Sequence, residues 1–139
     1  MTSPTDELQV AMVARMEAFG PLTTLVALRI YDRVEEADRN DVDFPYVAFG
    51  RVDEIRDDAE CIKGFDIRMQ IDCYSREPGK AECLQIADAV QLALHDEELI
   101  LPDNALVSLA HVRTVCQQVK GDIQTTHAAV IFDAFAEQP

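Results

Sequence analysis

Apolar and polar side chains alternate along residues 61–76, and this alternation is the clearest structural signal in the chain. One face of the segment carries Phe65, Ile67, Met69, Ile71 and Cys73, and the other carries Asp66, Arg68, Gln70, Asp72 and Tyr74. A period of two residues is that of a β-strand with one buried and one solvated face. Such a strand is typical of an antiparallel sheet that is covered on one side only.

Two other segments have the period of an α-helix. Residues 4–19 bring Leu8, Met12 and Met16 to one face, and Gly20-Pro21 is expected to end this helix. Residues 80–95 carry a single apolar stripe, formed by Cys83, Ile86, Ala87, Val90 and Leu94. Both segments are therefore predicted to pack one side against the sheet.

The remaining segments are shorter or less regular. Residues 22–28 fit either a short helix or an extended stretch, and we expect one helical turn before a strand at 28–34. Residues 35–43 indicate an exposed loop. Phe44-Pro45 favours an extended chain, so a strand is expected at 46–52. Two final strands are predicted at 106–119 and 124–136, joined by a turn at 120–122.

This order of elements predicts an α+β fold. It consists of a curled antiparallel sheet of four or five strands with two helices packed on one face. The length of 139 residues is that of one domain, so we expect residues 1–139 to form a single domain.

The predicted strands are long for a chain of this size. A strand of about 15 residues extends roughly 50 Å, whereas the radius of gyration expected for this chain length is about 14 Å. Such strands must curl, contain a bulge or project beyond the domain. The acidic run at 53–60 is expected to be a hairpin tip or a solvated strand end, where charge protects unpaired edges.

The charge balance argues against stable docking on nucleic acid or on an anionic membrane. The chain holds 12 Lys and Arg against 26 Asp and Glu, a formal net charge of −14. Binding to a phosphate backbone needs a basic surface, because it is driven by counterion release. The N-terminus has no secretory signal and no stretch approaches a membrane span, so we expect intracellular synthesis.

We find no catalytic constellation in the sequence, and we expect no cofactor and no metal. The motifs for phosphate loops, nucleophile elbows and zincin helices are absent. Cys61, Cys73, Cys83 and Cys116 form no CxxC pair and are expected to be reduced.

The histidines and aspartates offer only weak candidates for chemistry. His111 and His127 are candidates to pair across the last hairpin, and His95 is expected to complement a helix dipole. Asp66 and Asp72 lie about 20 Å apart on an extended strand, which is too far for a carboxylate pair, and we expect a surface Asp–Arg pair with Arg68.

The order and spacing of several short motifs resemble a known family. These motifs are Ile30-Tyr31-Asp32, Pro45-Tyr46-Val47, Ser75 with Gly79, and His127 followed by Val130 and Phe132. In this order they resemble the tail-completion proteins of long-tailed bacteriophages and gene transfer agents, whose members look like tail terminators. The resemblance covers roughly residues 6–137.

The resemblance implies a structural virion protein and not an enzyme. The expected form is a homo-hexameric ring that caps the head-proximal end of the tail tube, stops its polymerisation and joins the tail to the head-side connector. The expected partners are other copies of the chain, the tail tube protein and a head-closure or connector protein, with DNA only in transit. Synthesis in the host cytoplasm and a place in the neck of the virion follow from the same resemblance.

The acidic run supplies the candidate residues for a subunit interface or a ring lumen. We expect Asp53, Glu54, Asp57, Asp58 and Glu60 to face the ring lumen or a neighbouring subunit, since like charge keeps a translocating duplex off the wall. One alternative is another neck component, such as the head-closure or adaptor ring. A small hydrolase that uses His111 and His127 is a further alternative, and an acidic binding module of unknown partner is the last.

Overall fold

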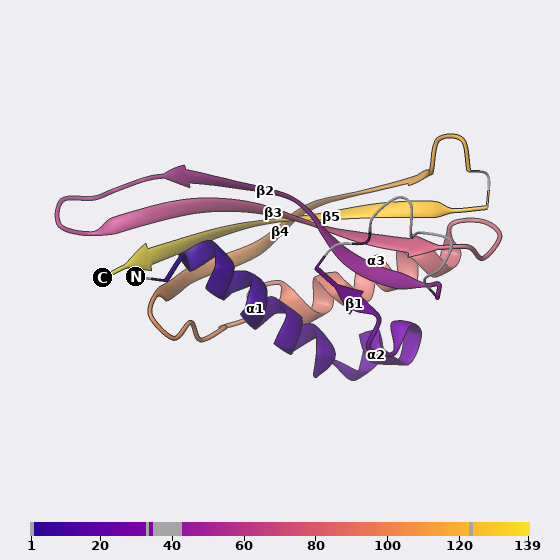
Figure 1. Ribbon diagram of the computed structural model, residues 1–139, viewed down its shortest axis with the longest axis horizontal. Coiled ribbons are helices and arrows are strands. Elements are labelled where there is room, and N and C mark those ends of the chain that lie inside the picture. The colour runs from indigo at the N-terminus through magenta and orange to yellow at the C-terminus, as the bar shows by residue number, and fades with distance from the viewer. Residues whose placement is uncertain (1, 33, 35–42, 123) are drawn as a thin grey trace.

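A twisted sheet with all its helices on one face makes up the described part of the chain (Figure 1). The computed structural model describes residues 2–32, 34, 43–122 and 124–139. Its helices are α1 (Pro4–Glu17), α2 (Gly20–Val26) and α3 (Ala81–Leu94), and its strands are β1 (Ile30–Tyr31), β2 (Tyr46–Arg56), β3 (Lys63–Ser75), β4 (Ala105–Gln118) and β5 (Thr126–Gln138).

The described strands lie in the order β1-β2-β3-β5-β4. The two central strands pair without a break from Lys63 opposite Gln138 to Ser75 opposite Thr126. Pairing is antiparallel between β2 and β3, β3 and β5, and β5 and β4. The short β1 runs parallel to β2 and makes the sheet mixed at that edge. The predicted α+β class is confirmed.

The hydrophobic core lies between the helices and the inner face of the sheet. The alternating apolar residues of β3 point inward, as the sequence pattern predicts, and Ile67, Met69 and Ile71 are at most 1% exposed. They meet Phe132 of β5 and the apolar stripes of α1 and α3. Burial of these side chains is the main force that holds the helices on the sheet.

A buried carboxylate fastens α1 to the segment that leads into β4. Glu7, 6% exposed, accepts hydrogen bonds from the backbone N–H of Asp103 and, at 2.6 Å, from the side-chain amide of Asn104. Ser3 caps the helix by accepting a hydrogen bond from the backbone N–H of Asp6. A hydrophobic pattern alone does not reveal the contact between α1 and residues 103–104, because both ends of it are polar.

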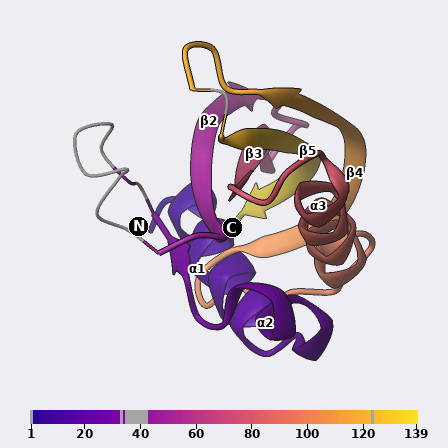
Figure 2. The same cartoon turned by 90° about the vertical axis from the view of Figure 1, so that its right-hand side faces the viewer.

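The long strands curl, contain bulges and project. Register shifts occur in β2 between Phe49 and Val52, and in β4 at two places. Figure 2, viewed along the molecule, shows the sheet curling around α1 and α3. The β2–β3 hairpin extends past the N-terminal end of α1 (Figure 1). Residues 53–56 are the end of β2, and its turn follows at 57–62.

Three sequence-based boundaries need correction. The first helix ends at Glu17, and Gly20 begins α2, since proline fits the first turn of a helix. Residues 22–28, left open by the sequence, are largely helical. Among the described residues of the strand expected at 28–34, Ile30 and Tyr31 form β1, and they pair with two residues of β2. Residues 35–42 of the expected loop lie outside the described residues.

Candidate subunit interface

The turn of the β2–β3 hairpin, residues 57–62, is a well-ordered acidic loop that we call the acidic tip. The backbone N–H of Asp57 donates to the carbonyl of Gly64 at 2.8 Å, and Ala59 and Ile62 exchange two backbone hydrogen bonds. The Asp58 carboxylate accepts from the backbone N–H of Gly64. These bonds hold the tip in one shape at the far end of the hairpin.

Arg56 fixes one of the carboxylates at the tip. Its Nε lies 2.8 Å from Oδ2 of Asp58. This hydrogen bond lowers the pKa of Asp58 below its usual value, and the backbone N–H of Gly64 adds to the effect. No ion pair involves Asp57 or Glu60 within the described part of the chain, so these two carboxylates are available to a partner.

The five acidic residues singled out from the sequence point in three directions. Asp57, Asp58 and Glu60 lie together at the acidic tip. Asp53 lies on the outer face of the sheet, where it pairs with Arg51 at 3.3 Å. Glu54 lies on the inner face and accepts a hydrogen bond from the Thr5 hydroxyl of α1. A strand places successive residues on opposite faces, so the run cannot form one surface.

The outer face of the sheet, opposite the helices, carries a second charged pair. Arg68 of β3 and Asp133 of β5 form a bidentate ion pair at 2.7 and 3.0 Å. The pair lowers the pKa of Asp133 and raises that of Arg68. The expected Asp–Arg pair exists, but the partner comes from the neighbouring strand and not from Asp66 or Asp72.

The histidines do not form one site. The chain reverses between Val119 and Thr125, so His111 lies opposite Phe132 and His127 lies opposite Gln117. The expected pairing of His111 with His127 is wrong.

Each histidine has a contact of its own. His127 bonds Asp72 at 2.6 Å, and Nδ1 of His95 accepts the backbone N–H of His111 in β4. His95 therefore covers part of a sheet edge, a role that the sequence analysis missed because it depends on tertiary contact.

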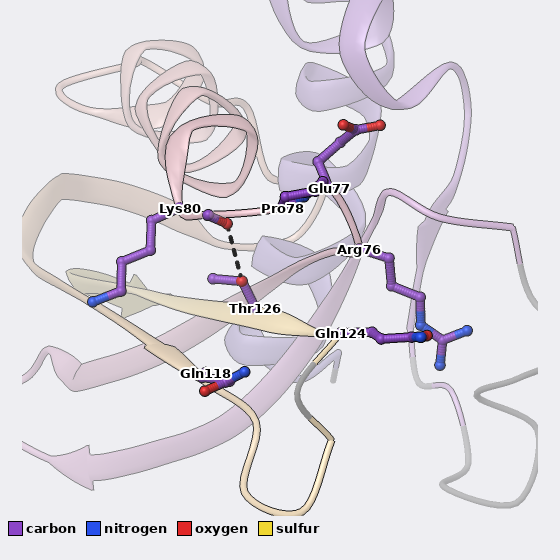
Figure 3. A pocket seen from close by; sticks show the side chains of 8 residues that line it. Arg76, Glu77, Pro78, Lys80, Gln118, Gln124 and Thr126 are labelled. Atoms are coloured by element: carbon purple, nitrogen blue, oxygen red, sulfur yellow. Dashed lines mark hydrogen bonds between the residues drawn. The ribbon is translucent and has the colours of Figure 1, made fainter.

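A polar pocket of about 660 Å³ lies at the other end of the molecule, between the loop that follows β3 and the β4–β5 hairpin. Figure 3 shows Lys80 on one side of it, Arg76 with Gln124 on the other, and Thr126 between them. Arg76 is held in place: it donates to the Thr125 hydroxyl, pairs with Asp122 at 3.7 Å and stacks over Phe44 at 4.1 Å. Sequence reasoning gave no signal for this pocket.

The described residues offer little reactive chemistry. They contain no cluster of three or more His, Cys, Asp or Glu side chains that would hold a metal ion. All four cysteines lie in this part of the chain and are unpaired. Burial raises the pKa of the Cys83 thiol to about 12 and that of Cys73 well above its usual value, so these thiols are inert. None of the described helices has the length and apolar character needed to cross a bilayer.

Comparison with known proteins decides the family. The family model described as "Tail completion protein gp17" matches residues 10–137, nearly the whole chain. The chain belongs to this tail completion family. The family consists of structural virion proteins and not enzymes, so the chain is a tail-associated structural component of a virion.

A solved structure has the same fold. A chain of the structure described as "Virion of native gene transfer agent (GTA) particle" superposes with a TM-score of 0.86 at 24% identity, over 99% of each chain. No curated protein matches this tail completion protein. The resemblance to tail completion proteins that the sequence motifs indicated is confirmed.

Proposed function

We propose that this tail completion protein is a tail terminator, a single-domain subunit of a homo-hexameric ring. The ring caps the head-proximal end of the tail tube, stops its polymerisation and joins the tail to the head-side connector. Its partners are the tail tube protein and a head-closure or connector protein. The observation that carries the proposal is the family match over residues 10–137.

The shape of the subunit supports a ring. The acidic tip and the polar pocket lie at opposite ends of an elongated molecule (Figure 1), so each subunit presents two unlike ends. A contact between unlike ends is heterologous, and its repetition closes a ring when the rotation between neighbouring copies is a whole fraction of a turn. The related fold found in a gene transfer agent virion supports a place in the particle itself.

The net charge supports a role around a DNA channel. The chain has a formal net charge of −14, and an acidic wall repels a translocating duplex and keeps it from adhering. We propose that DNA passes through the ring without binding to it, and that Asp53, Glu54, Asp57, Asp58 and Glu60 face the lumen or a neighbouring subunit. Synthesis in the host cytoplasm precedes assembly into the neck of the virion.

The capping role is tested with purified tail tube protein. Tube protein is polymerised alone and with this protein, and tube lengths are measured by electron microscopy while native mass spectrometry follows the assembly. A terminator shortens the tubes, labels one end of each, and forms a species of six 15.5 kDa copies, near 93 kDa.

Two outcomes would contradict the terminator assignment. Tubes of unchanged length with no bound protein would do so directly. Binding to the connector protein without binding to the tube would favour a head-closure or adaptor ring instead.

A further inference from the structure

The two ends of the molecule differ in charge. Residues 53–60 contain five acidic residues and one base, Arg56. The pocket at the opposite end is lined by Arg76 and Lys80 and by one acid, Glu77, whose carboxylate is directed away from Gln118 and Gln124 (Figure 3). Asp122, which pairs with Arg76, adds a second acid at this end, so bases and acids balance there, whereas residues 53–60 carry an excess of four acids.

Lys80 is the cation that the pocket offers to a ligand. Arg76 is already held by Asp122, Thr125 and Phe44. Lys80 is exposed, and no carboxylate of the described residues lies within ion-pair distance of it. The helix α3 starts at the next residue, and Glu82 in its first turn, which accepts a hydrogen bond from the Ser75 hydroxyl, offsets the positive end of the helix dipole.

Most of the residues that line the pocket have polar side chains. Thr126 lies within it and donates from its hydroxyl to the carbonyl of Gly79 at 3.3 Å, which joins the 76–80 loop to the start of β5. The amide side chains of Gln118 and Gln124 lie on the β4–β5 side. Amide groups and an ammonium group together suit a polar, carboxylate-rich segment better than an apolar one.

The acidic tip has the properties that such a pocket requires. It projects beyond α1, its backbone is held by internal hydrogen bonds, and its Asp57 and Glu60 carboxylates have no ion-pair partner among the described residues. A tip that is already ordered loses little conformational entropy on docking. Because the tip and the pocket lie at opposite ends, the tip of one copy can reach only the pocket of another.

We infer that the acidic tip of one copy docks into the pocket of the next, with the Asp57 and Glu60 carboxylates facing Lys80. The occupant is therefore a second copy of this chain. The inference rests on the proposed ring and identifies the contact that closes it. Opposite charges steer the two ends together and set the register of the contact.

The test reverses the charges on each side separately and then combines the variants. Lys80→Glu leaves a chain with an acidic tip and an acidic pocket. Asp57→Lys with Glu60→Lys places two lysines at the tip of a chain whose pocket keeps Lys80. Native mass spectrometry across a concentration series measures assembly of each protein, with and without tail tubes as a template.

We expect each charge-reversed protein alone to need at least about tenfold higher concentration to assemble than the unmodified chain. An equimolar mixture of the two is expected to recover assembly, because every contact in an alternating ring then joins opposite charges. Lys120→Glu is the matched control: it makes the same charge change on the exposed hairpin between β4 and β5, outside the pocket lining. It is expected to assemble like the unmodified chain.

Three results would overturn the inference. They are normal assembly of Lys80→Glu, an equal loss for Lys120→Glu, and no recovery in the mixture. A zero-length carbodiimide cross-link in the assembled, unmodified protein must also join Lys80 to Asp57 or Glu60 of another copy. A cross-link from Lys80 to the tube protein would also overturn the inference, and so would the absence of any cross-link from Lys80.

Failure of the inference is distinguishable from failure of the proposed function. If the unmodified chain forms rings and caps tubes but Lys80→Glu does so equally well, the terminator assignment stands and the contact lies elsewhere. If the unmodified chain neither caps tubes nor assembles on them, the terminator assignment fails and the tip-to-pocket contact with it. Circular dichroism of each variant confirms that the charge changes leave the fold intact.

Discussion

Two hydrogen-bonded side-chain pairs lie on the same outer face of the sheet and join the same two strands, yet they have very different surroundings. His127 meets Asp72 at 2.6 Å with side chains 20% and 12% exposed. Arg68 meets Asp133 at 2.7 Å with side chains 55% and 47% exposed. The two pairs therefore have similar contact distances and differ in the exposure of their side chains.

Aromatic neighbours explain the difference in exposure. Tyr46 of β2 stacks on Tyr74 of β3 at 5.0 Å, and Tyr74 stacks on His127 of β5 at 4.9 Å. This row covers the outer face at the end near the pocket, although no helix does. Toward the acidic tip the row ends and the outer face is open. One sheet face is thus built for stability at one end and available for contact at the other.

Removal of the His127 side chain is expected to give the largest loss of stability. The Asp72 side chain is 12% exposed with His127 in place, and His127→Ala leaves it Gln70 as its remaining side-chain partner at 2.8 Å. We expect the free energy of unfolding to fall by about 2–4 kcal/mol, because a buried carboxylate loses a partner. Urea denaturation followed by circular dichroism measures the loss.

His111→Ala is the matched control for this variant. His111 is half-buried, and among the described residues its ring has one hydrogen bond, with the Thr114 hydroxyl, and an edge contact with Phe132, so a smaller loss is expected. If the two variants lose equal stability, the buried position of the His127–Asp72 pair does not add to the stability of the protein.

A methyl group at Gly50 is expected to disturb the same buried pair. A Cβ there would lie 2.4 Å from Oδ2 of Asp72. We expect Gly50→Ala to lower the free energy of unfolding by about 1–3 kcal/mol, as overpacked sites do.

A double-mutant cycle shows whether the clash at Gly50 is with Asp72 itself. Gly50→Ala should cost much less in an Asp72→Ala background, since the clashing carboxylate is gone. Gly20→Ala is the matched control, because a Cβ at Gly20 meets nothing within 4 Å. Additive losses in the cycle would contradict the close approach.

The hydrophobic pattern was enough to predict the sheet and its inner face. The alternation in β3 identifies the buried residues correctly, and helical spacing finds α1 and α3. These elements are predictable because burial of one face imposes a period on the sequence. The sequence did not decide between a helix and an extended stretch at α2, since seven residues around a proline have no diagnostic period.

The candidate interface was predictable only in part. The acidic run does reach the tip of a projecting hairpin, as strand length and charge indicated. The sequence could not show that Glu54 turns inward to Thr5, because that depends on the register shift between Phe49 and Val52. The pocket with Lys80 joins residues that are far apart in the chain, and a single sequence carries no signal for such contacts.

Loss of the exposed Arg68–Asp133 pair is expected to have little effect on stability. Arg68 and Asp133 are both about half exposed, and exposed ion pairs are weakened by solvent and by the entropy of fixing long side chains. In the same urea experiment we expect Arg68→Ala to unfold at nearly the same urea concentration as the unmodified protein, and at a clearly higher concentration than His127→Ala. A loss of stability as large as that of His127→Ala would contradict the expected difference between the two ends of the outer sheet face.

Acid is expected to remove even the small contribution of the Arg68–Asp133 pair to the stability of the protein. Arg68 lowers the pKa of Asp133 below 3.8, the value of the free carboxyl, mainly through their hydrogen bond. A lowered pKa in the folded state stabilises the protein above the unfolded pKa, and this stabilisation is lost as the pH falls through the folded value. Any difference in stability between the unmodified protein and Arg68→Ala should therefore be constant near neutral pH, decline as the pH falls below 3.8, and vanish once the pH is below the folded pKa of Asp133. Paired urea titrations from pH 7 downward measure it, and a difference that grows in acid would mean that Arg68 acts through a group other than Asp133.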